Sequence, residues 1–287
     1  MTAIIKKEMK TYFHNMSGYV FLFFFVILTA LFFMMTNVLQ LNGEYFYTLI
    51  NSTMIFMVMV PMLTMRLFAE EYAQKTDQLL YTSPVPTYSI VLGKFVAACL
   101  VLLIAMIITL IFPYLISSFG KLPVNRIAGT YIGFYFLGCS FVSIGMLVSV
   151  MTNNQIVAAV GSFALIFVFY MADSVINAIP STREAGLVFA AVIALILSFM
   201  LYSSTKNIKA GIAAFAGLVL ISAVIFLTSP SLYDGLAVKS LKWVSLMSHF
   251  QGFSLGILEV TDMVYYISFS LLLNFFTISI IEKRRWA

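Results

Sequence analysis

The sequence predicts an all-α, polytopic membrane protein with about eight transmembrane helices, and three observations lead to it. Of the 287 residues, 62% are hydrophobic and only 9% are charged, whereas a soluble domain carries roughly 25% charged residues. The apolar residues fall in runs of about 20, the length that an α-helix needs to cross a bilayer. The lysines and arginines gather at the ends of these runs. Since no segment between the runs is long enough to bury a core, we expect one transmembrane domain over residues 1–287.

Eight apolar runs are predicted to span the membrane. They are Gly18–Asn37, Leu49–Phe68, Ile90–Ser117, Ile127–Met151, Ile156–Ile176, Ala185–Tyr202, Ala210–Thr228 and Met263–Ile281. The sixth and seventh runs form a pair for which the sequence leaves an alternative. If that pair did not cross, six spans would remain with the same orientation.

Charge counts orient the spans, because cytoplasmic loops carry an excess of lysine and arginine. With the N-terminus inside, eleven of the 16 basic residues lie on the inner side and five on the outer side. The inner set is Lys6, Lys7, Lys10, Arg66, Lys75, Lys94, Lys206, Lys209, Lys283, Arg284 and Arg285. The outer set is Lys121, Arg126, Arg183, Lys239 and Lys242. Both termini are therefore expected in the cytosol. The net charge of +5 fits this placement and does not indicate a nucleic-acid partner.

Two further segments are predicted to lie at the membrane surface. Residues 4–14 place three lysines on one helical face and apolar residues on the other, which is typical of an interfacial helix on anionic lipid. Residues 229–262 are too polar to cross and too apolar to extend freely into water. We expect one or two helices in the outer interface, or a re-entrant segment buried by protein.

The longest polar interruption in the first half runs from Arg66 to Lys94, and residues 69–81 within it are predicted to form an amphipathic helix. One face of the helical wheel would carry Ala69, Tyr72, Ala73, Thr76, Leu79 and Leu80, and the other Glu70, Glu71, Gln74, Lys75, Asp77 and Gln78. Pro84 and Pro86 would end the helix. The helix would lie along the membrane with its charged face in water. An ordinary solvated loop helix fits the same pattern.

Catalytic and cofactor motifs are not found. The sequence has no G-x-x-x-x-G-K-[ST] phosphate loop and no H-E-x-x-H, and His14 and His249 fall on opposite predicted sides. Cys99 and Cys139 lie within apolar runs and are expected to pack rather than to bind a metal. We therefore expect no enzyme activity and no cofactor in this chain.

Three residues in or near the predicted spans have two readings. Asp173, near the outer end of the fifth span, either contacts solvent at the headgroups or contacts substrate. Met57 and Met62 in the second span suit ordinary packing, or a surface adapted to a greasy substrate. Four glycines of the fourth span would allow close helix contacts within the subunit. They are Gly129, Gly133, Gly138 and Gly145.

Two motifs resemble those of ABC-2-type permeases. The first is Glu70-Glu71-x-x-x-x-Thr76-x-x-Leu79-Leu80-x-x-Ser83-Pro84-Val85, followed by Gly93-Lys94. The second is Phe250-x-x-Phe253-x-x-Gly256-Ile257-Leu258 with Asp262-x-x-Tyr265-Tyr266, and it is similar to the subclass associated with gliding-motility-type and multidrug export systems. Members of the family typically have six spans, so the pair at 185–228 is a departure.

The resemblance implies a permease subunit in the bacterial inner membrane that pairs with itself or a paralogue and binds a separate ABC ATPase, which holds the ATP and magnesium. It also implies that the segment 69–81 is a coupling helix. The coupling residues would be Arg66, Glu70, Glu71, Thr76, Leu79 and Leu80, and residues 4–14 would be a connecting helix. Met57, Met62, Asp173, Phe250 and Phe253 are the candidates for an outer gate or substrate path. The cargo implied is a lipid, peptide or drug moved outward.

Three other classes remain open at this point, one of them an intramembrane enzyme, which would need a polar catalytic cluster that the sequence does not show. An ion-coupled secondary transporter would need midplane carboxylates or broken helices, which the spans do not clearly show. A non-transporting membrane scaffold would bind partners without coupling them to ATP.

Overall fold

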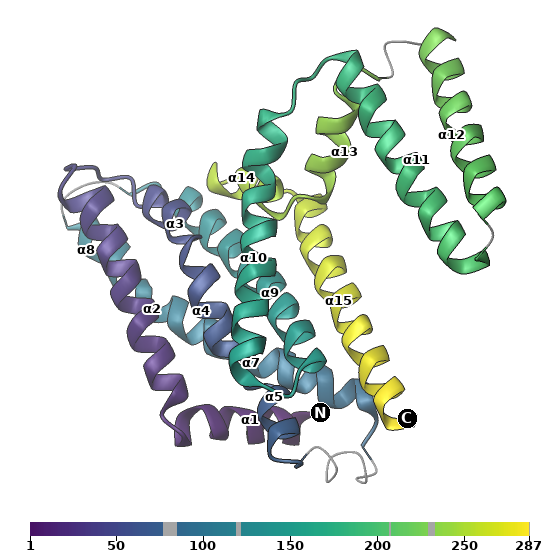
Figure 1. Cartoon of the computed structure of the whole chain (residues 1–287). Coiled ribbons are helices and arrows are strands. Elements are labelled where there is room, and N and C mark those ends of the chain that lie inside the picture. The colour runs from purple at the N-terminus through teal and green to yellow at the C-terminus, as the bar shows by residue number, and fades with distance from the viewer. Residues whose placement is uncertain (77–84, 119–121, 207, 229–232, 287) are drawn as a thin grey trace. The chain divides into compact units, whose positions relative to one another are not determined.

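The computed structural model describes residues 1–76, 85–118, 122–206, 208–228 and 233–286, and the regular elements in these ranges are helices (Figure 1). By contacts the chain divides into two compact units. Unit 1 joins Met1–Tyr170 to His249–Ala287, and unit 2 is Met171–Ser248. The all-helical prediction is confirmed.

Unit 1 is a helical bundle organised around α9. Its helices are α1 (Thr2–His14), α2 (Ser17–Phe33) with a π-helical turn η1 (Met34–Val38), α3 (Phe46–Ser52), α4 (Ile55–Thr64), α5 (Ala69–Ala73), α7 (Thr87–Thr109), α8 (Ile111–Ser117), α9 (Val124–Met151), most of α10 (Gln155–Ala178), the end of α14 (Leu246–Ser254), and α15 (Val260–Trp286). Helix α9 packs against α15, α4, α7 and α3. It is therefore the element that positions the others.

Glycines on α9 allow this packing, as the sequence predicted. A Cβ added at Gly133 would collide with the Cβ and ring of Phe253, and one at Gly145 would collide with Thr64. Gly138 and Gly129 make similar close approaches, to Leu102 and to Gly256. All four contacts lie within the subunit, where close approach increases van der Waals contact between helices.

The contact between Gly129 and Gly256 is backbone against backbone. A Cβ at Gly129 would lie 3.0 Å from the Cα of Gly256, and a Cβ at Gly256 would lie 2.7 Å from the Cα of Arg126. Gly256 also has φ +79°, a conformation that side-chain-bearing residues rarely adopt. The connection between α14 and α15 is thereby held directly on α9.

The second predicted span, 49–68, is not one straight helix. It is divided into α3 and α4, with a bend of 57° between Phe46–Ser52 and Ile55–Ala73. At the break, the hydroxyl of Thr53 donates to the carbonyl of Ile50 at 2.7 Å. Such side-chain-to-backbone hydrogen bonds compete with the backbone hydrogen bonds of the helix. A hydropathy profile alone does not detect them.

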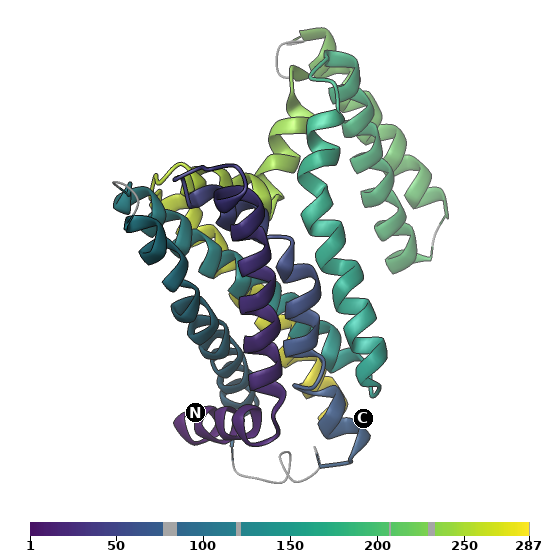
Figure 2. The ribbon, with the colours of Figure 1, turned by 90° about the vertical axis from the view of Figure 1, so that its left-hand side faces the viewer.

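Helix α1 runs crosswise to α2, and both chain termini lie at the same end of unit 1 (Figures 1 and 2). Gly93 of α7 makes room for α1, because a Cβ there would lie 2.8 Å from Cγ2 of Ile4. This arrangement agrees with the predicted surface helix at 4–14 and with termini on one side of the membrane.

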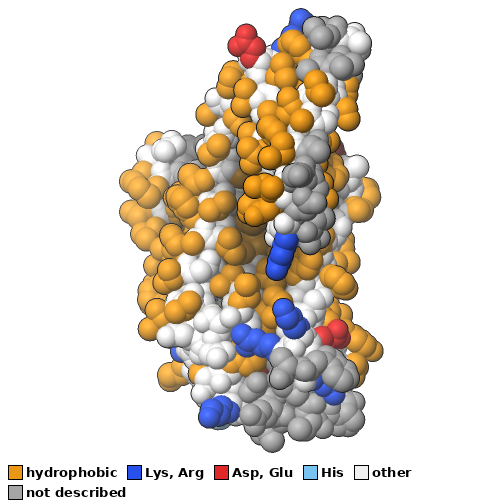
Figure 3. All heavy atoms as spheres, turned by 45° about the vertical axis from the view of Figure 1, so that its right-hand side comes forward, with side chains coloured by type: hydrophobic (Ala, Val, Ile, Leu, Met, Phe, Trp, Pro, Cys, Tyr) orange, Lys and Arg blue, Asp and Glu red, His pale blue; other side chains and the backbone are white. Residues whose placement is uncertain are grey.

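Six helices of the described residues are long and apolar enough to cross a membrane, or seven if the bent pair is one span. Some side chains of α12 (Ile208–Thr228) lie outside the described residues, so the predicted count of eight stays a prediction. Hydrophobic side chains cover much of the described surface seen in Figure 3, and lysines and arginines lie mainly in the lower half of that view and also at its upper edge. The protein is a membrane protein.

Unit 2 contains the end of α10, then α11 (Arg183–Thr205), α12 and α13 (Leu236–Val244). Helices α11 and α12 pack against each other, and α11 also contacts α13. An exposed ion pair joins Arg183 to Asp234, with Nε 2.9 Å from Oδ1. The hydroxyl of Tyr233 donates to the carbonyl of Ser222 at 2.9 Å. In the described part of the segment 229–262, α13 and α14 are two short helices, and residues 260–262 already belong to α15.

Candidate functional site: the junction of α4 and α5

The predicted coupling helix is shorter than the sequence indicated. Helix α5 ends at Ala73, and Lys75 adopts a left-handed conformation with φ 56°. The amide of Thr76 then donates back to the carbonyl of Glu71 at 3.0 Å. A left-handed residue directly after a helix is a common way for the helix to end. The prediction of one helix over 69–81 is therefore wrong for residues 74–76, and residues 77–84 lie outside the described part.

Three neighbouring helices bind the backbone groups that the end of α4 and the start of α5 leave free. The hydroxyl of Tyr12 in α1 donates to the carbonyl of Leu63 at 3.0 Å. The ammonium of Lys94 in α7 donates to the carbonyl of Leu67 at 2.7 Å. The hydroxyl oxygen of Ser149 in α9 accepts the amide of Phe68 at 3.1 Å. The junction is thus fixed to α1, α7 and α9 by polar side chains.

The Tyr12 hydroxyl is kept as a donor by its surroundings. Burial, and secondly the nearby Glu8 carboxylate, raise the pKa of Tyr12 well above its usual range. Because burial disfavours the phenolate, the Tyr12 hydroxyl keeps its proton and its bond to Leu63.

A cluster of charges lies beside the junction. Nζ of Lys94 is 2.9 Å from Oε1 of Glu71 in α5 and 3.2 Å from Oε1 of Glu8 in α1. Lys94 is 1% exposed, and Nζ is 5.1 Å from the centre of the Phe68 ring. Nζ of Lys7 also reaches Glu71, at 3.4 Å, but from the surface. We call Glu8, Glu71 and Lys94 the α1–α5–α7 charge cluster.

This cluster corrects the predicted role of Glu71. The helical wheel placed Glu71 on the water-facing side, but its side chain is 17% exposed and its carboxylate faces Lys94. The side chain of Glu70 is partly exposed and accepts a bond from Nε2 of Gln74 at 3.4 Å. Arg66 and Thr76 are exposed. Of the predicted coupling residues, Arg66, Glu70 and Thr76 are accessible, while Leu79 and Leu80 lie outside the described residues.

The last span also reaches α5. The guanidinium of Arg284 lies over the ring of Tyr72, 4.6 Å from its centre. It also donates to the carbonyl of Met151 at 3.3 Å and to Oδ1 of Asn153 at 3.4 Å. Helix α5 therefore contacts side chains from both ends of unit 1's sequence.

A groove of about 330 Å³ lies beside α5. Polar and charged residues of α1, the α4–α5 junction and α7 line it, including Lys7, Asn15, Arg66, Glu70 and Thr76. The exposed face of α5 and the groove together form an irregular, charged surface, which suits contact with another protein.

The predicted outer-gate residues occupy packed positions. Met57, Phe250 and Phe253 are buried, and Phe253 lies against Gly133. Met62 is partly exposed. These residues do not form an open path in this structure.

Asp173, considered within unit 2, is bonded to its neighbours. Its Oδ1 accepts the hydroxyl of Ser248 at 2.5 Å, and its Oδ2 accepts the amide of Asn177 at 3.3 Å. Its carboxylate is thus engaged in structural bonds, and a contact with substrate stays a prediction.

Sequence reasoning missed Glu8 and Ser149 and did not give Lys94 a role. A signal for Glu8 existed, since Ile4, Glu8 and Tyr12 are spaced i, i+4 and so share one face of α1. Lys94 stands within an apolar run, where a charge needs a partner. Ser149 carries no such signal, because buried serines in helices commonly bond their own backbone.

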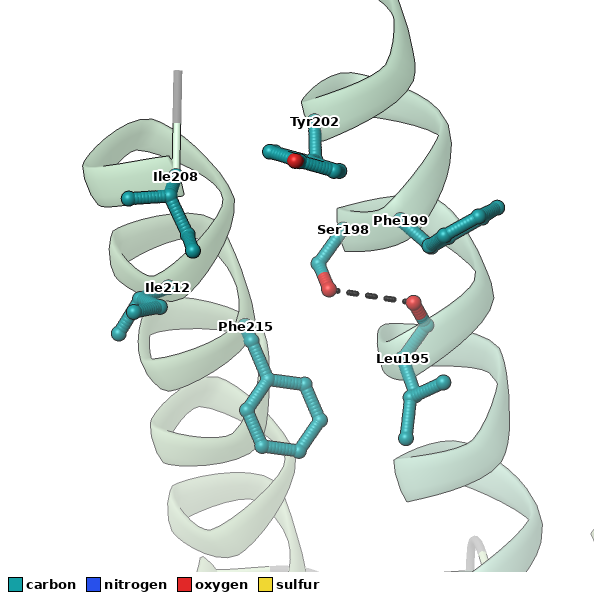
Figure 4. Close-up of a pocket in the computed structure, with 7 residues that line it drawn as sticks. All are labelled: Leu195, Ser198, Phe199, Tyr202, Ile208, Ile212 and Phe215. Atoms are coloured by element: carbon teal, nitrogen blue, oxygen red, sulfur yellow. Dashed lines mark hydrogen bonds between the residues drawn. The ribbon is translucent and has the colours of Figure 1, made fainter. Parts of the chain in front are cut away.

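A hollow of about 300 Å³ lies between α11 and α12 in unit 2 (Figure 4). Its walls are mainly apolar: Leu195, Ser198, Phe199, Tyr202, Ile208, Ile212 and Phe215. The hydroxyl of Ser198 is bonded to the carbonyl of Leu195 at 3.1 Å. Such a surface suits acyl chains, and it offers few groups for recognising a polar ligand.

The long apolar helices and the junction described above define a polytopic membrane component. A sequence model of the family described as ABC-2 family transporter protein matches residues 37–184, more than half of the chain. This protein belongs to that family and is a permease component of a transporter. The matched region contains α5, Lys94 and the whole of α9. A comparison with curated proteins finds no match.

Proposed function

We propose that this chain is the membrane-spanning subunit of an ATP-driven exporter, and that a separate ABC ATPase docks on α5. One observation carries the proposal. Helix α5 contacts side chains of α1, α7, α9 and α15, while Glu70, Gln74 and Thr76 remain accessible beside the groove. A partner that moved α5 would therefore act on several helices at once.

A displacement of α5 can drive transport only if the ATPase binds the inward-open and outward-open arrangements with different free energies. In this mechanism, closure of the ATPase pair on ATP displaces α5 laterally, and the spans tilt. Family resemblance supports the seam between two permease subunits as the substrate route, lined by the first, second and fifth spans.

The substrate proposed is hydrophobic or amphiphilic: a lipid, a peptide or a drug. The exposed aromatic side chains of α2, among them Tyr19, Phe23 and Phe24, support this choice. Export as the direction and the bacterial inner membrane as the location rest on the family resemblance. The second subunit would be another copy or a paralogue.

The first test is co-purification of the tagged chain with an ATP-binding protein that carries a phosphate-binding loop. We expect the wild-type chain to retain this ATPase and Glu70→Arg to reduce its recovery, because the substitution reverses a charge on the docking surface. The matched control is Glu44→Arg, which reverses the charge of an exposed glutamate in the loop before α3, away from α5 in the sequence. Recovery that is equal for the three proteins would refute docking at α5.

The second test separates the proposal from an ion-coupled transporter and a scaffold. In proteoliposomes that hold the complex and a fluorescent phospholipid, we expect lipid movement to need ATP and to persist when ion gradients are dissipated. Movement that stops with the gradient would identify a secondary transporter. A complex that forms without ATP, and in which nucleotide causes no movement of α5, would identify a scaffold.

A further inference from the structure

Lys94 is a buried lysine whose ammonium group joins three segments of unit 1. It contacts Glu8 of α1, Glu71 of α5 and the carbonyl of Leu67 at the end of α4. An ammonium has three N–H donors, and these three acceptors match that number. A buried charge is stable only when it is paired and hydrogen-bonded, so the burial of Lys94 requires these partners to stay together.

We propose that Lys94 is a positioning residue that makes α1, α5 and the start of α7 move as one body during the transport cycle. The inference rests on the proposed function, because it assigns the path by which a displacement of α5 reaches the bundle. Helix α5 has five residues and is too short to carry a displacement into the bundle by itself. The charge cluster supplies the connection to α7, the third predicted span.

Two further contacts favour a rigid connection between these helices. Ile4 of α1 lies against Gly93, the residue before Lys94, so that α1 packs on α7 beside the cluster. The Phe68 ring, directly before α5, lies beside the ammonium group. Separating α5 from α7 would leave the carboxylate and the ammonium group without their bonds in a low-dielectric site, which is costly. The helices should therefore be displaced together.

Lys7 provides a matched control. It reaches the same carboxylate oxygen of Glu71, at 3.4 Å, yet its side chain is 56% exposed. Removing Lys7 deletes the same formal charge from a position beside the cluster, but exposed ion pairs contribute little. The two lysines therefore separate the effect of a buried connection from that of net charge.

The test measures helix movement directly and needs no knowledge of the substrate. Spin labels are placed at the exposed positions Lys6 of α1, Ala73 of α5 and Tyr88 of α7, with the buried Cys99 and Cys139 replaced by alanine. The full complex with its co-purified ATPase is held in nanodiscs. Inter-label distances are measured by pulsed EPR without nucleotide and after trapping with ATP and vanadate.

In the wild-type complex we expect the three distances to be the same in the two states, within the width of each distribution. In Lys94→Met, trapping should shift the distance between positions 73 and 88 beyond that width, whereas Lys7→Met should behave as wild type. A wild-type complex in which positions 73 and 88 already separate on trapping would overturn the inference. So would a folded Lys94→Met complex that keeps the wild-type distances.

Lys94→Met alone leaves two carboxylates without their buried partner and is liable to fail in folding. The variant Glu8→Gln, Glu71→Gln, Lys94→Met removes the whole set of buried charges and is expected to fold and to show the same shift. Unchanged distances in this variant would equally overturn the inference. If no ATPase co-purifies with the wild type, the proposed function fails and this inference fails with it. If the ATPase binds and is active but the variants move as wild type, only the role of Lys94 is refuted.

Discussion

The hydroxyl oxygen of Ser149 accepts the amide N–H of Ala69 at 3.2 Å, so that a side chain of α9 caps the first turn of α5. The same oxygen accepts the amide of Phe68, and the hydroxyl donates to the carbonyl of Met65. Phe68, the residue at the N-cap position, has no side-chain oxygen to do this itself. The start of α5 is therefore determined by a distant part of the sequence.

Substituting Ser149→Ala should destabilise the junction. Two buried amides would lose their acceptor, which costs about 1–3 kcal/mol. We expect a lower free energy of unfolding in an SDS titration and faster amide exchange at residues 68–73. Ser143→Ala is the control, since that buried serine of α9 bonds the carbonyl of Cys139 one turn earlier. Equal exchange rates at α5 in both variants would contradict the capping role of Ser149.

Substituting Tyr12→Phe should remove the bond between α1 and the end of α4. The expected cost is about 0.5–1.5 kcal/mol, the net contribution of one hydrogen bond, measured by the same titration near neutral pH. Tyr19→Phe, which changes an exposed tyrosine of α2, should have no comparable effect. A loss of the same size in both variants would show that the bond to Leu63 does not contribute.

The contribution of Tyr12 should also depend on pH. Its pKa in the folded protein is raised by burial, whereas in the unfolded chain it stays near 10.0. Above that pH the unfolded chain loses the proton first, so the unfolded state is favoured. The difference in stability between wild type and Tyr12→Phe should be constant below pH 10.0 and should shrink as the pH rises further. A difference that grows above that pH would contradict this assignment.

Two glycines offer the same substitution in different surroundings. In Gly133→Ala the new methyl group would overlap Phe253, and overpacking of this kind costs about 1–3 kcal/mol. In Gly217→Ala the methyl group meets no atom within 4 Å, and alanine favours a helix over glycine by up to about 1 kcal/mol. Thermal unfolding in detergent should therefore move in opposite directions. A gain in stability for Gly133→Ala would refute the close contact.

Buried and exposed ion pairs should respond differently to the loss of one charge. Lys94→Met leaves Glu8 and Glu71 without their buried partner and should cost about 3–5 kcal/mol. Asp234→Asn removes a charge from the exposed pair with Arg183 and should leave the unfolding midpoint unchanged. Thermal unfolding in detergent compares the two. A midpoint for Lys94→Met that equals the wild-type value would show that the buried charges are not held by one another.

Much of the fold could be predicted because hydropathy depends on composition over long windows. The predicted span 127–151 corresponds to α9 at Val124–Met151, and the predicted surface helix 4–14 to α1 at Thr2–His14. The glycine contacts of α9 followed from the same reasoning, since a missing side chain on a buried helix allows a neighbour to approach. These features follow from the composition of a single helix. Predicting them does not require knowing which residues of another helix lie against it.

The site was less predictable because it depends on pairings between distant residues. A helical wheel assumes that polar residues face water, and it therefore placed Glu71 outward. The structure pairs this carboxylate with Lys94, which the sequence separates from it by 23 positions. The end of α5 at Ala73 depends on the left-handed Lys75, a conformation for which lysine has no sequence preference. The ABC-2 resemblance directed attention to the segment that contains α5, but it did not predict that the Glu71 side chain faces Lys94.

The backbone contact between Gly129 and Gly256 has a consequence for the evolution of this chain. Two positions 127 residues apart must both remain without a side chain, and neither can compensate for a change in the other. A replacement at 256 would meet both an unfavourable φ and the backbone of Arg126. In a library that samples every amino acid at these two sites, we expect the surviving variants to carry glycine at both positions.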